Sequence, residues 1–284
     1  MLKRRDFLKI ITATLLGDGI FSGAFATDIT TPTPPLPSEH DSHVKDYLYK
    51  MQNFDTHHQQ DIILNGQDLR LLKKTVWRLR RLESFVGHGN FYLLNFDDAL
   101  KTARHSPGIG AFDQNEIAFL ERIFYQDASA YGFRGEKPLE HISDRIDRSK
   151  AVRIPQTGNY VYQGASLETF HRIRKDVGKK VVLTSGLRSI PKQFLLFLNK
   201  AKQHQGNLSL ASRSLAPPGY SFHGVGDFDV GHVKLGSDNF TLRFTKTDVF
   251  RQLQELGYIE LRYHQNNHLG VRFEPWHIKV QTIA

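Results

Sequence analysis

The sequence G-Y-S-F-H-G-V-G-D-F-D-V-G at residues 219–231 constrains the fold more than any other part of the chain. His223 and Asp229 are good ligands for a divalent metal such as zinc, which binds imidazole nitrogen and carboxylate oxygen readily. On a straight strand they would lie roughly 20 Å apart, at about 3.3 Å per residue. Two ligands of one ion therefore require the chain to fold back between them. Gly224 and Gly226 can supply that turn, because glycine enters left-handed conformations without a Cβ clash.

A second group of ligand residues begins 45 positions after Asp229, in the tetrapeptide E-P-W-H at residues 274–277. It supplies a third ligand, His277, and a free carboxylate, Glu274. A catalytic zinc site needs three protein ligands, one position open to water and a carboxylate nearby. We therefore expect the two histidines and Asp229 to bind one Zn²⁺ ion, with Glu274 beside it.

Glu274 and His277 cannot both reach the metal from an ideal strand. Residues three apart on a regular strand point to opposite faces of the sheet. A proline within a strand is confined to edges, strand starts and bulges. We therefore predict a bulge or a twist around Pro275-Trp276, which would bring both side chains to the same side.

Composition limits the chemistry that the chain can use. It has no cysteine, which excludes disulfides, cysteine-bound zinc and every cysteine-nucleophile mechanism. With 284 residues, 39% of them hydrophobic, it can form one large domain or two small ones with a real core. The formal net charge of +9 indicates a basic surface that would attract an anionic polymer, either nucleic acid or cell envelope. No nucleic-acid-binding module accompanies this charge, so we expect no nucleic-acid partner.

Residues 1–26 have the features of a secretory signal peptide. A basic start is followed by a short apolar run and by an A-x-A cleavage site that ends at Ala26. The pair Arg4-Arg5 is typical of a twin-arginine export signal. An aspartate and two glycines interrupt the apolar run, which is too weak for a stable membrane anchor. We expect an exported protein of the periplasm or cell envelope, with a Pro/Thr-rich linker at residues 27–39.

Residues 40–150 are predicted to be mostly helical. Four apolar residues follow the 3-4-3 spacing of a buried helix face: Leu69, Leu72, Val76 and Leu79. A further helix is predicted to start at Asp113, because D-Q-N-E is an acidic variant of a capping box and apolar residues follow at helical spacing. The region shows no catalytic pattern, and we expect it to shape a substrate groove.

Residues 151–284 alternate between helices and strands, which predicts an α+β domain with a small antiparallel sheet flanked by helices. The predicted helices are 165–176, 191–205 and a third that starts after a Thr247 cap and ends near Gly257. The predicted strands are 181–183, the end of the stretch 219–231, and two closing strands at 258–263 and 270–280. This domain would carry the zinc site.

Three motifs in a fixed order connect these observations: S-G-x-R-S at 185–189, S-x-H-x-x-G-x-x-D at 221–229 and E-P-W-H at 274–277. Together they resemble the VanY-type D-alanyl-D-alanine carboxypeptidases, which are zinc peptidases of the bacterial cell wall. The resemblance covers roughly residues 158–280 and does not include the N-terminal half. It implies a zinc-dependent enzyme that hydrolyses peptidoglycan stem peptides, with removal of a terminal D-amino acid as the expected reaction.

Matched motif by motif, the resemblance implies roles for these residues: His223, Asp229 and His277 as zinc ligands, Glu274 as catalytic base, Arg188 as the cation facing the scissile carbonyl, and Ser221 and Gln193 as substrate-pocket residues. The chain departs from the family in two places. The family usually has one more residue between its histidine and its aspartate, so Asp227 stays open as an alternative ligand to Asp229. The tyrosine that commonly precedes the arginine is Leu187 here, which leaves the choice of substrate open.

Two other functions are compatible with parts of the sequence. Ser189 and Lys192 match the S-x-x-K of serine penicillin-binding enzymes, and residues 237–239 match their S-D-N, but the K-T-G that should follow is missing. Under this alternative a β-lactam would abolish activity and a chelator would not. The other alternative is a non-catalytic wall-binding module on the same fold. Such a module would lack at least one of the three ligands or the glutamate, and all four are present.

Overall fold

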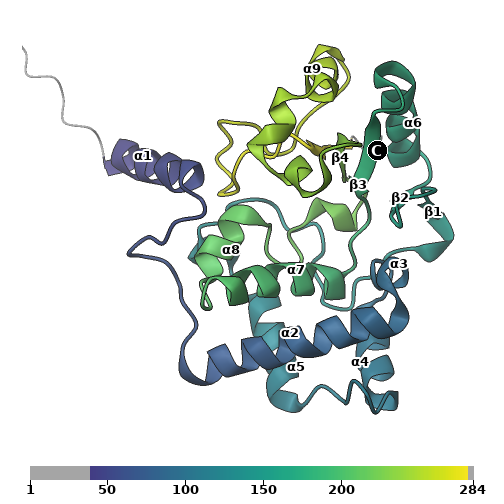
Figure 1. The fold of residues 1–284 in the computed structure, drawn as a ribbon. Helices are drawn as coiled ribbons and strands as arrows, with labels where there is room; N and C mark the ends of the chain where they lie inside the picture. The colour runs from purple at the N-terminus through teal and green to yellow at the C-terminus, as the bar shows by residue number, and fades with distance from the viewer. Residues whose placement is uncertain (1–38, 281–284) are drawn as a thin grey trace, which may run out of the picture. The chain divides into compact units, whose positions relative to one another are not determined.

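A layer of helices lies beside a small antiparallel sheet in the computed structural model of this protein, which describes residues 39–280 and their side chains from Asp46 on (Figure 1). The predicted signal peptide at residues 1–26 lies outside the described residues, as does the predicted linker apart from its last residue. Among residues 39–280, no helix is both long enough and apolar enough to cross a membrane.

The first half of the described chain is helical, as predicted. Its helices are α1 Glu39–Gln52, α2 Gly66–Val86, α3 His88–Phe91, α4 Phe96–His105 and α5 Gln114–Tyr125, followed by two short 3₁₀ helices, η1 Ala128–Tyr131 and η2 Arg148–Lys150. Leu72, Val76 and Leu79 of α2 are buried, which confirms the predicted apolar face. Asp113 and Glu116 form the predicted capping box at the start of α5, where each side chain accepts a hydrogen bond from the backbone N–H of the other.

The second half of the described chain combines helices with two small antiparallel sheets, so the predicted α+β class is confirmed. The α-helices are α6 Ala165–Val177, α7 Ile190–Gln203, α8 Leu208–Ser214 and α9 Asp248–Glu255, and the 3₁₀ helices are η3 Phe222–Gly224, η4 Gly236–Phe240 and η5 Leu242–Lys246. Strands β1 Ala151–Arg153 and β2 Tyr160–Tyr162 form one sheet, and strands β3 Val181–Ser185, β4 Phe228–His232 and β5 His277–Ile278 form the other, in the order β3-β4-β5. Thr247 caps α9 as predicted, because its hydroxyl accepts the N–H of Phe250.

The register of the three-stranded sheet places three site residues in one row. Ser185 on β3 pairs with Asp229 on β4, and Asp229 pairs with His277 on β5. The pairing shifts between Leu183 and Ser185, which marks an irregularity at the start of the S-G-x-R-S motif. Directly opposite residues on one face of an antiparallel pair have Cβ atoms about 5 Å apart. The row therefore brings two of the predicted metal ligands together.

Two hydrophobic cores support this arrangement. The larger one joins α2, α4 and α5 to α7 and α8, and its most buried residues include Leu120, Phe124, Phe194 and Leu198. The smaller one packs α6 and α9 against the three-stranded sheet. Because α7 and α8 follow residue 150, the larger core draws on both sides of the predicted domain boundary there. The boundary itself stays a prediction.

The two predicted closing strands are largely wrong. Residues 258–263 contain only a single bridge, between Leu261 and Ile278, and of residues 270–280 only the two residues of β5 are strand. Gly270 has a φ of 83°, and Pro275 has no N–H to donate, so neither residue extends a strand. Helix α8 was not predicted from the sequence, although Asn207 marks its start by accepting the N–H of Leu210.

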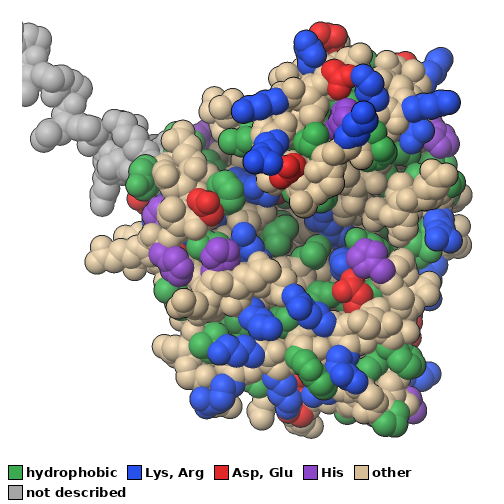
Figure 2. All heavy atoms as spheres, viewed as in Figure 1, with side chains coloured by type: hydrophobic (Ala, Val, Ile, Leu, Met, Phe, Trp, Pro, Cys, Tyr) green, Lys and Arg blue, Asp and Glu red, His purple; other side chains and the backbone are tan. Residues whose placement is uncertain are grey.

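One face of the molecule is basic and hollowed (Figure 2). Lys and Arg side chains are spread over this face and far outnumber Asp and Glu there, as the net charge of +9 predicts. The hollow lies between the part that carries α7 and the part that carries α9 (Figures 1 and 2). Hydrophobic and basic side chains are visible within it.

A buried ion pair ties the segment before α2 to α8. The guanidinium of Arg213 donates to both carboxylate oxygens of Asp61, at 2.7 and 2.9 Å, and both side chains are buried. Burial raises the pKa of Asp61, but hydrogen bonds from Arg213, from the Asn207 side chain and from the backbone N–H of His58 lower it to about 2. A carboxylate whose folded pKa is lowered contributes stability above its unfolded pKa and loses it as the pH falls.

Asp61→Asn should therefore lower the free energy of unfolding at pH 7 by about 2 kcal/mol, the equivalent of this pKa shift. The difference between wild type and variant should shrink as the pH falls from about 4 to about 2, because the wild-type carboxylate then becomes protonated. Urea denaturation at several pH values measures both effects. Asp97→Asn, which removes an exposed partner of Arg145, is the matched control and should change little. A difference that does not depend on pH would contradict the assignment.

Candidate metal centre and active site

The three predicted metal ligands come together in the structure. His223 is in η3, Asp229 in β4 and His277 in β5, and one nitrogen or oxygen atom of each lies within 4.8 Å of the others. His223 Nε2 is 3.2 Å and His277 Nδ1 is 3.6 Å from Asp229 Oδ1. The two imidazole rings meet edge to face, with centroids 4.7 Å apart. All three residues are almost completely buried, so the site is shielded from bulk water.

The chain folds back ahead of Asp229 at Gly226, which has a φ of 127°. A Cβ on this residue would lie 2.9 Å from Ser166 Oγ, so both the backbone conformation and the space favour glycine. Gly224 does not have a positive φ, so the prediction that it makes the turn is wrong. A Cβ on Gly224 would lie 2.6 Å from the side chain of Leu139, so glycine allows that leucine to pack closely there.

Two atoms at the centre of the site have no hydrogen-bond partner, and this tests whether the residues fit a metal. His223 Nδ1 lies 2.7 Å from the carbonyl oxygen of Gly186 and donates to it, so Nε2 carries a lone pair. Burial, and then the charge of Arg188, lowers the pKa of His223, which keeps the ring neutral. His223 Nε2 and Asp229 Oδ1 are both buried and unpaired, 3.2 Å apart. Two such acceptors repel each other unless a cation lies between them, so the donor set fits a metal ion.

His277 presents Nδ1 to the centre of the site, whereas His223 presents Nε2. Its Nδ1 lies 3.3 Å from Glu274 Oε2, and its Nε2 lies 3.0 Å from Asp227 Oδ2. Burial lowers the pKa of His277, but the hydrogen bonds to Asp227 and Glu274 raise it to about 9. The surrounding carboxylates therefore favour positive charge at this position, which is a second way in which the residues fit a cation.

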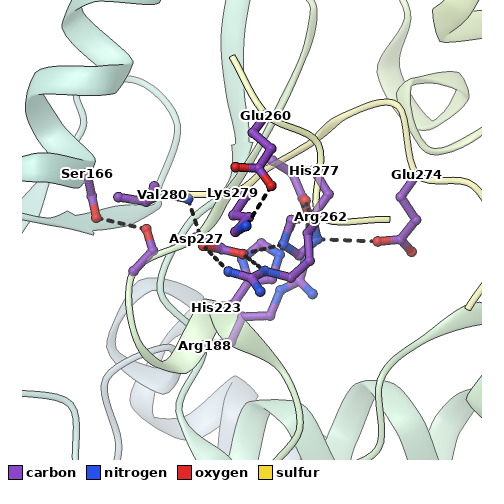
Figure 3. Close-up of polar contacts among 12 residues, drawn as sticks. Ser166, Arg188, His223, Asp227, Glu260, Arg262, Glu274, His277, Lys279 and Val280 are labelled. Atoms are coloured by element: carbon purple, nitrogen blue, oxygen red, sulfur yellow. Dashed lines mark hydrogen bonds and ion pairs between the residues drawn. The ribbon is translucent and has the colours of Figure 1, made fainter. Parts of the chain in front are cut away.

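The geometry favours Asp229 over Asp227 as the third ligand. Asp229 belongs to the group of atoms that could share one ion, and Asp227 does not. The carboxylate of Asp227 is occupied by Arg262, by a histidine ring nitrogen and by a backbone N–H (Figure 3). Asp229 instead uses Oδ2 to accept a hydrogen bond from Arg188, 2.6 Å away, and turns Oδ1 to the centre.

Glu274 and His277 reach the same side of the site through a tight turn. The backbone N–H of His277 donates to the carbonyl of Glu274 at 3.1 Å, and Pro275 occupies the second position of the turn, which its fixed φ suits. A turn thus takes the place of the bulge or twist that we predicted around Pro275-Trp276, because the chain at Pro275 does not belong to the sheet. Glu274 is buried beside the ligands, and its contact with the His277 ring is visible in Figure 3.

Arg188 lies at the site and is paired with a predicted metal ligand. Its Nε donates to Ser185 Oγ at 2.9 Å, and a terminal nitrogen donates to Asp229 Oδ2. Burial raises the pKa of Asp229, but the positive charge of Arg188 helps to hold it well below its usual range. The arginine therefore keeps Asp229 ionised and leaves one of its oxygens available. Spacing in the sequence could not reveal this pair, because it depends on the register between β3 and β4.

The two predicted substrate-pocket residues lie close to Arg188. Gln193 Nε2 donates to the carbonyl of Arg188, and Gln193 Oε1 accepts the N–H of Gly219, both at 2.9 Å. The side-chain amide thus joins the arginine loop to the segment that leads to the histidine motif. Ser221 is buried immediately before η3. Gln193 is therefore in position to set the geometry of the loops around the site.

The residues of the serine-enzyme alternative do not form a catalytic pair. The hydroxyl of Ser189 donates to the carbonyl of Phe91 at 2.9 Å. Lys192 Nζ donates to Glu83 Oε1 at 2.7 Å, so the lysine is bound in an ion pair and not directed at the serine. Asn239, from the S-D-N match, bonds to the backbone of His232. These contacts give the serine mechanism no support.

Two residues next to the site were missed in the sequence analysis. The ring of Tyr263 meets the ring of His277 edge to face, with centroids 5.0 Å apart. The guanidinium of Arg262 stacks on the ring of Phe222, 3.4 Å from its centroid. Both missed residues fall in a stretch predicted as a strand, and no local pattern there marks them as part of a site.

Comparison with known proteins shows which family this part of the chain is similar to. Residues 162–282 match the family model described as VanY, D-alanyl-D-alanine carboxypeptidase. Among curated proteins, none is similar enough to this chain to count as a match. The chain is similar to a solved structure of the LdcB LD-carboxypeptidase, with 23% sequence identity, 48% of this chain and 69% of that chain covered, and a TM-score of 0.38.

Two solved structures of VanY proteins are also similar to the chain. A VanY D,D-pentapeptidase variant of a VanB-type vancomycin-resistance cassette, in complex with Zn(II), is 20% identical, with 46% of this chain and 77% of that chain covered and a TM-score of 0.34. VanYB in complex with D-alanine-D-alanine is 20% identical, with 47% and 77% covered and a TM-score of 0.35. The family match itself spans all four residues of the site, from the first histidine to the last. The part of this protein that carries the site, residues 162–282, is similar to the VanY family of D-alanyl-D-alanine carboxypeptidases.

Proposed function

We propose that this protein is an exported, zinc-dependent peptidase that hydrolyses peptidoglycan stem peptides, acting as a D-alanyl-D-alanine carboxypeptidase. The observation that carries the proposal is the pair of buried, unpaired acceptors, His223 Nε2 and Asp229 Oδ1, with His277 and Glu274 beside them. Such a set of three ligands is suited to zinc and leaves the fourth coordination position of the ion for a water molecule. The family match supports a peptidase of the cell wall.

Each site residue has a role in this proposal. When bound, zinc supplies an activated water and polarises the scissile carbonyl. The buried carboxylate of Glu274 accepts the proton of the attacking water and later delivers it to the leaving amine, as a general base and then a general acid. Arg188 is permanently charged and stabilises the oxyanion from its position beside Asp229. Ser221 and Gln193 have the substrate-pocket roles that the family resemblance implies, and Gln193 also holds the Arg188 loop to the segment at Gly219.

The predicted location and partner agree with this function. The predicted twin-arginine signal peptide would deliver the enzyme to the periplasm or cell envelope, where its substrate is found. The basic, hollowed face in Figure 2 would favour approach to an anionic wall. No nucleic-acid partner and no stable membrane anchor form part of the proposal.

The test is hydrolysis of a peptide ending in D-Ala-D-Ala by purified protein, with zinc content measured on the same sample. A chelator should abolish release of D-alanine, added zinc should restore it, and a β-lactam should have no effect. A peptide with an L,D bond before its terminal D-alanine, tested in parallel, defines the specificity. Inhibition by the β-lactam but not by the chelator would overturn the zinc mechanism. Zinc binding without any hydrolysis would instead identify a binding module.

A further inference from the structure

We infer that Asp227 is a positioning residue for the metal centre, which holds His277 with Nδ1 directed at the ion. The inference deepens the proposed function and rests on its zinc site. Asp227 is buried, and its Oδ2 lies 3.0 Å from His277 Nε2. Histidines that bind metal through one ring nitrogen commonly donate the other N–H to a carboxylate, which fixes the tautomer and the ring orientation.

The carboxylate of Asp227 is itself held in place on several sides (Figure 3). Arg262 donates to both of its oxygens, and the backbone N–H of Val280 donates to Oδ1 at 2.9 Å. The residue before it is fixed as well, since Ser166 Oγ donates to the carbonyl of Gly226 at 2.8 Å. The lone pairs of both Asp227 oxygens are occupied by these hydrogen bonds, so none is left for the ion. Because the carboxylate is fixed in place, it can hold the neighbouring His277 ring in one orientation.

The same contacts join the three segments that surround the site. Asp227 lies between the two ligands of the central motif, Val280 follows β5, and Arg262 comes from the loop between α9 and the E-P-W-H turn. Arg262 also stacks on Phe222, which is adjacent to His223. The Asp227–Arg262 pair thus links the backbone around both histidine ligands. In the tautomer set by Asp227, the proton is on Nε2 and the lone pair is on Nδ1, the atom 3.6 Å from Asp229 Oδ1.

The experiment measures zinc affinity by competition with a chromophoric chelator, independently of activity. Asp227→Ala should weaken zinc binding by about 10- to 100-fold, the effect expected for a carboxylate that orients a metal-bound histidine. Asp227→Asn keeps one acceptor oxygen, so its loss of zinc affinity should be smaller than that of Asp227→Ala. Glu260→Gln is the matched control, because Glu260 is a carboxylate of the same region that pairs with Lys279 (Figure 3), and the zinc affinity of this variant should equal that of wild type.

A second measurement separates positioning from folding. Asp227→Ala leaves the partly buried Arg262 without its partner carboxylate, so the double variant Asp227→Ala/Arg262→Met removes both charges together. It should fold and still show the loss of zinc affinity. In ¹H–¹⁵N spectra of the histidine rings in zinc-loaded protein, wild type should show His277 bound through Nδ1 with a proton on Nε2. The folded variants should lose the single protected Nε2–H signal.

The outcomes that would overturn the inference are distinct from a failure of the proposed function. Unchanged zinc affinity and an unchanged ring spectrum in folded Asp227→Ala would show that the carboxylate does not position His277. A loss as complete as that of Asp229→Ala would show that Asp227 is a ligand. If wild type binds zinc but hydrolyses no peptide, the proposed enzyme is wrong, while the affinity series still tests Asp227.

Discussion

Glu274→Gln should reduce the rate of D-alanine release by about 10²- to 10⁴-fold, the range typical of a lost general acid–base residue. The amide has nearly the shape of the carboxylate but cannot accept the proton of the attacking water. Glu274 lies 3.3 Å from His277 Nδ1 and is outside the group of three that could share the ion, so zinc should stay bound. Single-turnover hydrolysis and zinc analysis of the same preparation measure the two properties separately.

Glu255→Gln, on the exposed last residue of α9, is the control for replacing a glutamate away from the site. It should hydrolyse the peptide at the wild-type rate. A Glu274→Gln variant as active as wild type would show that this carboxylate does not move the proton. Zinc loss in that variant would instead show that Glu274 helps to hold the ion, and its role would have to be reassigned.

His223→Ala should abolish zinc binding and, with it, hydrolysis. The variant removes one of three ligands and leaves Asp229 and His277 to hold the ion alone. The fall in zinc affinity should exceed about 100-fold, the upper range for residues that only orient a ligand. Zinc content after dialysis, and affinity by chelator competition, measure the effect.

His232→Ala provides a matched control for that experiment, because His232 is on β4 three residues after Asp229 and faces Asp248 instead of the site. It should keep full zinc content and activity. If His223→Ala retained its zinc while folded, the ligand assignment would be wrong. An equal loss in both variants would point to a general effect on the sheet.

The convergence of His223, Asp229 and His277 could be predicted from the sequence because each residue lies in a short motif of metal-binding residue types. The need for a turn between His223 and Asp229 followed from strand geometry alone, and Gly226 provides it. The capping residues Asp113 and Thr247 likewise identified helix starts, since capping is a local interaction between neighbouring residues. Local chemistry was sufficient wherever the contact partners are close in sequence.

Contacts between distant segments could not be predicted in the same way. The pairs Arg188–Asp229 and Asp227–Arg262 form across 41 and 35 residues, and they depend on how strands and loops are placed side by side. The prediction of the closing strands was wrong for a related reason. Their residue types suit a strand, but Gly270 and Pro275 turn the chain out of the sheet. Tertiary structure, not local preference, decided these segments.

The row of paired residues across β3, β4 and β5 has one more consequence. Side chains on neighbouring strand positions point to opposite faces, so a slip of one residue between β4 and β5 would turn His277 away from Asp229. A molecule mispaired in this way would keep its helices and its composition but would have no place for an ion. If the proposed zinc site is correct, loading with metal is a direct readout of correct strand alignment, and it distinguishes properly folded molecules from others that are equally compact.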